Sequence, residues 1–164
     1  MNLRIVFLFL FLNIAIFAQT YTFSEQRYSD ALDRTFELNG KISFLKENSL
    51  EVEYPQKKRN IVYRDGMLSL SEDGQVIEIS ENEAQGIMRY FDILLLLHKG
   101  DETLLNEQFF IKKSGVNMEL LPKGSIKNFL IKITLQGFGK DLKEVTLFMK
   151  NLDRVTIKIE NEIS

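Results

Sequence analysis

Side chains that could do chemistry are few in this 164-residue chain. It has one histidine, His98, and no cysteine, so it can form neither a disulfide nor a thiolate metal site. A lone histidine at the end of a predicted helix is more often a capping or surface residue than a catalyst. Glu78, Glu81 and Glu83 form an acidic group, but the capping of a helix start explains them. We therefore predict no enzyme activity, no cofactor and no metal site.

The chain has one compact basic run, Lys57-Lys58-Arg59, in a predicted loop between strands. Two interpretations stay open for it: a solvated turn, or contact with an anionic headgroup or an acidic docking surface on a membrane partner. The 21 basic and 23 acidic residues give a net charge of −2. Because phosphate binding needs a basic surplus on one face, this balance argues against nucleic acid as a partner.

One strongly apolar helix is predicted over Ser80–Gly100. Ser80 and Glu83 fit a capping box, and Gly100 is a natural end. Its apolar stripe is widened by Ile93, Leu96 and Leu97, beyond what a surface helix needs. The stripe itself consists of Ala84, Ile87, Met88, Phe91, Leu94 and Leu95.

Most of the remaining chain alternates apolar and polar residues, which is typical of antiparallel strands with one buried face. Leu50–Tyr54 is an example, and Asp65-Gly66 is a strong hairpin signal. The pattern predicts about nine short strands linked by hairpins, either an up-and-down barrel or a strongly curved sheet.

The first residues, Met1–Ala18, read as an export signal: Arg4 precedes an apolar run from Ile5 to Phe17. That run is shorter than the ~20 residues of a membrane-spanning helix, although a retained N-terminal anchor stays an alternative. Cleavage near Ala18 would leave residues 19–164 as a single periplasmic domain.

The order of several short motifs resembles the periplasmic lipoprotein-carrier (LolA-like) family over nearly all of the mature chain. The motifs are Phe23-x-x-Gln26, Gly40-x-Ile42-x-Phe44, Leu50–Tyr54-Pro55, Ile61-x-x-x-Asp65-Gly66-x-Leu68, Phe109 to Leu121-Pro122, and Ile131-x-Ile133. Further pieces resemble a divergent branch, whose members accompany the export of lipids other than lipoproteins: Gly100-Asp101 with Phe109 downstream, Leu120-x-Pro122, and Asp153-Arg154.

The resemblance implies a mainly β fold, an unclosed antiparallel barrel with one or two lid helices. It implies a monomeric periplasmic chaperone, not an enzyme, that shields acyl chains of lipoproteins during transfer to the outer membrane. Its partners would be an inner-membrane extraction complex and an outer-membrane acceptor. A carrier of a non-protein lipid or lipid-linked product, or a structural envelope domain with a filled core, stays an alternative. The expected cavity and lid residues are Ile42, Phe44, Leu50, Val52, Tyr54, Leu68, Leu70, Ile87, Met88, Phe91, Leu94 and Leu95.

The chain departs from the family at two places. Family members have an arginine and a proline just after the strand corresponding to Lys41–Leu45, and the arginine is associated with holding the lid closed. Here that place reads Lys46-Glu47-Asn48. The latch would be absent, replaced by Lys46 or built differently. Few residues between Ala18 and Phe23 are available for the family's leading helix.

Overall fold

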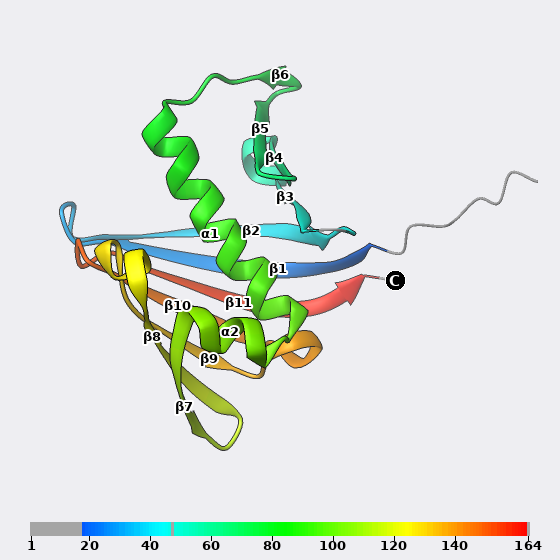
Figure 1. Cartoon of the computed structure of the whole chain (residues 1–164). Helices are drawn as coiled ribbons and strands as arrows, with labels where there is room; N and C mark the ends of the chain where they lie inside the picture. Colours follow the sequence, from blue (N-terminus) through cyan, green and yellow to red (C-terminus); the bar gives the residue numbers. More distant parts are fainter. Residues whose placement is uncertain (1–17, 47, 164) are drawn as a thin grey trace, which may run out of the picture.

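The computed structural model describes residues 18–46 and 48–163, so most of the predicted signal Met1–Ala18 lies outside the described residues. Within them, the chain forms eleven strands, two α-helices and three short 3₁₀ turns (Figure 1). The strands are β1 (Gln19–Ser29), β2 (Arg34–Phe44), β3 (Ser49–Tyr54), β4 (Arg59–Arg64), β5 (Met67–Glu72), β6 (Gln75–Val76), β7 (Phe109–Ser114), β8 (Asn117–Pro122), β9 (Leu130–Gln136), β10 (Glu144–Met149) and β11 (Arg154–Ile163). The helices and turns are α1 (Glu81–Lys99), α2 (Glu102–Gln108), η1 (Pro55–Lys57), η2 (Gly124–Asn128) and η3 (Gly139–Asp141).

All these strands belong to one sheet, in the order β6-β5-β4-β3-β2-β1-β11-β10-β9-β8-β7. The strand pairs along it are antiparallel, from β5–β6 at one end to β7–β8 at the other. Within the described residues β6 and β7 stand at opposite ends of the order, so the sheet is an unclosed antiparallel barrel, as predicted. We call β1–β6 the N-terminal wing and β7–β11 the C-terminal wing; they join where β1 pairs with β11.

Helix α1 begins and ends where its capping residues predict. The backbone N–H of Glu83 donates to Ser80 Oγ at 3.3 Å, which satisfies one of the free amides of the first turn. At the other end Gly100 adopts the left-handed conformation, with φ of 71°. Asp101 then caps α2 by accepting from the backbone N–H groups of Thr103 and Leu104. Neither α1 nor any other helix in the described ranges combines the length and apolarity needed to cross a membrane.

The second half of α1 lies between the wings and packs against both (Figure 1). Phe91 and Leu94 belong to the core cluster of the N-terminal wing. Ile93 and Leu97 belong to that of the C-terminal wing. A helix that faces two apolar surfaces needs apolar residues on two sides. This is why the stripe is widened by Ile93 and Leu97, as the sequence indicated, and why both are buried.

Candidate functional site

An apolar cavity of about 420 Å³ lies between the first half of α1 and the concave face of the sheet. Its floor includes Leu38 of β2 and Val155 of β11, beside the half-exposed ring of Phe36. In Figure 1 the hairpin ends of these central strands extend past α1. The floor is apolar because alternate side chains of each strand point to the same face. The volume falls in the range of roughly 300–1,000 Å³ that is typical of small-molecule sites.

The wall and the roof of the cavity are mostly apolar as well. Ile61 of β4 and Leu70 of β5 form part of the wall, together with Tyr54. Ile79, just before α1, and Ile87 within it form part of the roof. The apolar side chains that line a space of this size are not packed against one another across it. A bound ligand would supply those contacts.

Gly86 keeps the roof of the cavity open. It lines the cavity from the middle of α1, and a Cβ built on it would meet no atom within 4 Å. Glycine inside a helix costs about 1 kcal/mol relative to alanine. The glycine therefore lowers the stability of the helix but leaves the space beside it open. A larger side chain at this position would fill that space.

A buried carboxylate lies beside the cavity. Glu25 of β1 has only 1% of its surface exposed. It accepts hydrogen bonds from Arg27 Nε, from the Tyr54 hydroxyl at 3.0 Å and from the Tyr90 hydroxyl at 3.4 Å. Burial first, and then the charge of Glu25, raises the pKa of both tyrosines, so both stay protonated donors. Since Tyr90 belongs to α1, this group ties the helix to the sheet.

Two further polar contacts hold α1 against the N-terminal wing. The Tyr63 hydroxyl of β4 donates to Asp92 at 2.5 Å, and burial followed by this bond raises the pKa of Tyr63 to about 12. The His98 ring stacks on Phe44, with ring centroids 3.6 Å apart, and its Nε2 lies 3.1 Å from Gln19 Oε1. His98 is thus a packed residue of α1. Lys46, one of the residues considered for the latch, is exposed.

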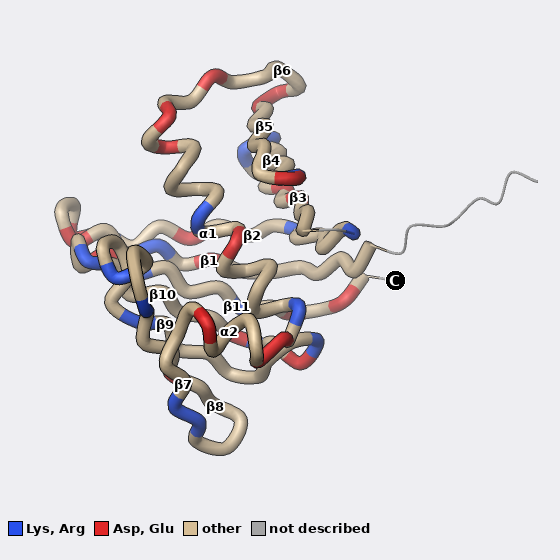
Figure 2. The backbone as a smooth tube through the Cα atoms, in the orientation of Figure 1, with Lys and Arg blue, Asp and Glu red and all other residues tan. Residues whose placement is uncertain are grey.

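Positive side chains gather at one side of the cavity. Arg27, Lys57 and Arg59 all line it, and Glu83 of α1 is the single acid in its lining. Arg59 donates through Nε and Nη2 to Glu72, at 3.0 and 2.7 Å. Figure 2 shows these basic residues of η1 and the start of β4 as a blue segment beside the N-terminal wing. Two residues of the predicted basic run therefore border the cavity.

All twelve predicted cavity and lid residues lie in or against the core cluster of the N-terminal wing. Four of them, Tyr54, Leu70, Ile87 and Phe91, line the cavity. The other eight lie outside its lining and form the packing behind it. Their role in ligand binding stays a prediction.

Sequence reasoning missed Glu25, Arg27, Phe36 and Gly86. The sequence did contain a signal for Glu25 and Arg27. Every second residue of β1 lies on the same face, and this face carries Tyr21 and Phe23 followed by Glu25 and Arg27. Charged residues that continue a buried apolar face are uncommon and need partners. The partners, Tyr54 and Tyr90, come from distant parts of the chain, so only the fold reveals them.

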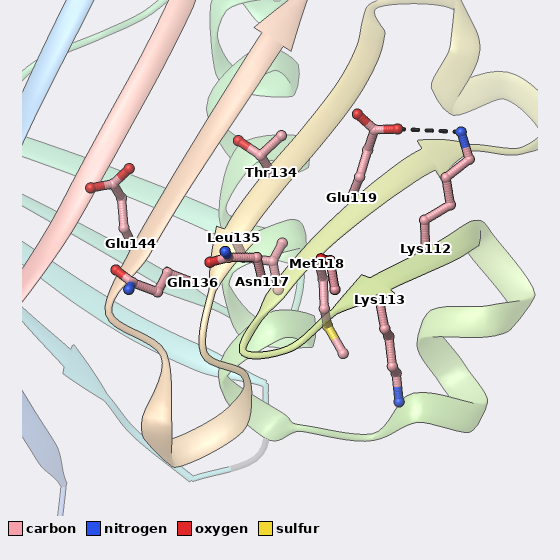
Figure 3. A pocket seen from close by; sticks show the side chains of 10 residues that line it. Lys112, Lys113, Asn117, Met118, Glu119, Thr134, Leu135, Gln136 and Glu144 are labelled. Carbon is pink, nitrogen blue, oxygen red and sulfur yellow. Dashed lines mark hydrogen bonds and ion pairs between the residues drawn. The ribbon is translucent and has the colours of Figure 1, made fainter.

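A second depression, of about 520 Å³, lies on the C-terminal wing (Figure 3). Most of its lining is polar, and Glu119, Thr134 and Gln136 point away from the core cluster formed by their neighbours. Glu119 pairs with Lys132 at 2.9 Å and with Lys112 at 3.5 Å; hydrogen bonding and charge from Lys132 lower its pKa. This polar surface lacks the features of an acyl-chain site. Among the described residues, no group of His, Asp and Glu could hold a metal ion.

No family model matches this chain, and no curated protein matches its sequence. Solved structures do match its fold. A domain described as a putative outer membrane lipoprotein-sorting protein from Vibrio parahaemolyticus aligns with a TM-score of 0.43 and 7% identity, over 89% of this chain and 84% of that one. A LolA superfamily protein from Nitrosomonas europaea aligns with a TM-score of 0.40 and 7% identity, over 88% and 84%. Both alignments describe a similarity of fold.

Proposed function

We propose that this protein is a non-enzymatic carrier that shields acyl chains in the cavity beneath α1. The observation that carries the proposal is the cavity itself, whose apolar wall and roof stay open at Gly86. A filled-core structural domain would have no reason to retain such a space. Each buried CH₂ group of a bound chain would contribute about 0.8 kcal/mol.

The two halves of α1 fit a lid that opens at one end. Ile87 and Met88 in the first half are only partly buried, whereas Leu94 and Leu97 in the second half are buried. The first half can therefore move away from the sheet while the second half stays anchored between the wings. Release of the cargo needs such a movement, and the tie between Tyr90 and Glu25 would oppose it.

The finer proposal concerns the cargo and the place. We propose that the protein acts in the periplasm, after export and cleavage near Ala18, and carries lipoprotein acyl chains between an inner-membrane extraction complex and an outer-membrane acceptor. A second cargo, a non-protein lipid, is favoured by the cationic side chains that line the cavity, because they suit a charged headgroup.

Filling the cavity tests the proposal. Gly86→Leu places a side chain in the open space and improves helix propensity, so the variant should fold at least as well as the parent. We expect its affinity for cis-parinaric acid, a fluorescent fatty acid, to fall at least about tenfold, a loss of about 1.4 kcal/mol. Fluorescence titration and thermal unfolding measure both effects.

Gly86→Ala is the matched control, because it changes the same position with a single methyl group and should retain binding. If the protein with Leu at this position remains folded and binds cis-parinaric acid as well as the parent, the cavity is not the acyl-chain site.

A further inference from the structure

Of the two cargoes named above, we propose the non-protein one, an anionic lipid whose headgroup binds to Lys57 and Arg59 at the side of the cavity while its acyl chain lies inside. This inference rests on the proposed function and names the class of cargo: an acyl chain that ends in a carboxylate or a phosphate. The proposal follows from the lining of the cavity, which combines cationic side chains with apolar ones.

Of the three cations that line the cavity, Lys57 is the one without an ion pair among the described residues. It closes the 3₁₀ turn η1, its side chain is exposed, and it lines the cavity. No carboxylate in the described ranges forms an ion pair with it, whereas the neighbouring Lys58 pairs with Asp73 at 2.8 Å. A solvated turn would not require Lys57 to border an apolar space. An anionic headgroup beside that space would give its ammonium group a partner.

Arg59 and Arg27 flank Lys57 with guanidinium groups that are already oriented. Glu72 holds Arg59, and Glu25 accepts from Arg27 Nε. A guanidinium has five N–H donors, so each arginine can donate to a second anion without leaving its carboxylate. The headgroup would meet one opposing charge in the lining, Glu83, which instead accepts from the Ser80 hydroxyl at 3.5 Å.

Size supports a lipid of modest bulk. The cavity volume of about 420 Å³ lies toward the lower end of typical ligand sites. Such a space suits one acyl chain more readily than several chains of a multiply acylated protein. The single-chain anionic lipid is therefore the cargo that both the charge and the volume favour.

The test compares an acid with its neutral ester. The protein is titrated with cis-parinaric acid, ionised at about pH 8, and with its methyl ester, which has the same chain and no charge. Replacing Lys57 and Arg59 by Gln together should weaken binding of the acid about tenfold, as loss of charge-assisted bonds would, and leave the ester unchanged. Added salt should weaken binding of the acid selectively.

Lys58→Gln is the matched control, since Lys58 carries the same charge in the same turn but its side chain does not line the cavity. It should bind the acid as the parent does. Equal binding of acid and ester by the parent protein, or equal losses in the double variant, would overturn the inference while leaving the carrier function intact. Binding of neither probe would contradict the carrier function itself.

Competition distinguishes the two sources of negative charge. Oleic acid supplies a carboxylate, 1-oleoyl lysophosphatidic acid a phosphate, and monooleoylglycerol neither, and each carries one oleoyl chain. Displacement of cis-parinaric acid by either anionic lipid, with monooleoylglycerol much weaker, supports the inference and identifies the headgroup. Displacement by monooleoylglycerol that equals or exceeds that of the anionic lipids contradicts it.

Discussion

Glu25 shows how a single residue can join the stability of the sheet to the position of the lid. A buried carboxylate is costly unless it is paired and hydrogen-bonded, and here one cation and two phenols satisfy it. Tyr54 and Arg27 come from the sheet, so they fix the carboxylate in place. Tyr90 comes from α1, so its hydroxyl is the donor that leaves when the first half of the helix moves.

Tyr90→Phe removes this donor and keeps the ring. Because Glu25 retains two other partners, we expect only about 1 kcal/mol loss in the free energy of unfolding. The dissociation rate of cis-parinaric acid should rise by a few-fold, as that free energy implies. Stopped-flow fluorescence measures the rate. Tyr28→Phe, which removes a hydrogen bond to Asp33 on the exposed β1–β2 hairpin, should leave it unchanged; an unchanged rate in Tyr90→Phe as well would mean that this bond does not hold the lid.

His98 gives the stability a pH dependence. Burial, and then the charge of Lys140, lowers its pKa below the ordinary value of 6.5. At pH values between the two, the unfolded chain binds a proton that the folded protein does not. The free energy of unfolding therefore decreases as the pH falls below 6.5 toward the folded pKa.

Urea unfolding between about pH 5 and pH 8 measures this slope. We expect His98→Gln to lose the part of the slope below 6.5, while the carboxylates contribute equally to both proteins. Identical pH profiles for the two proteins would show that His98 does not titrate differently on folding.

At the scale of elements, α1 has two structural roles. Its second half completes both core clusters, and its first half covers the cavity. Under the proposed function, the helix is anchored at its second half and opens at its first half. Substitutions in the two halves should accordingly affect different properties.

Leu97→Ala and Ile87→Ala test this division. Leu97 is fully buried, so its truncation should cost about 2–5 kcal/mol in the free energy of unfolding. Ile87 is partly buried at the cavity, so its truncation should cost about 1 kcal/mol and mainly weaken binding of cis-parinaric acid. Urea unfolding and fluorescence titration of both variants measure these effects. A reversed pattern would place the lid in the second half of α1.

The bounds of α1 could be predicted because they depend on local signals, the capping box at Ser80 and the left-handed Gly100. Its two-sided burial could not, since that depends on which wings flank it. Strand β1 lacks a strong alternating pattern beyond Phe23, because Glu25 and Arg27 replace apolar residues on its inner face. The basic run was visible in the sequence, but which of its members borders the cavity depends on the conformation of η1.

For the whole molecule, the open sheet makes the cavity possible. The long strands β1, β2 and β11 join the wings at the centre, and their hairpin ends extend beyond the helix. The unclosed sheet leaves an apolar floor that the first half of α1 covers.

The most direct test of the account is native mass spectrometry of the protein purified gently from its native cells and then incubated with excess oleic acid. The account predicts a 1:1 adduct whose mass identifies an acyl-bearing cargo, absent from the Gly86→Leu variant prepared in the same way. An apo mass alone for the parent protein, even after incubation, would contradict the central claim that the cavity beneath α1 holds an acyl chain.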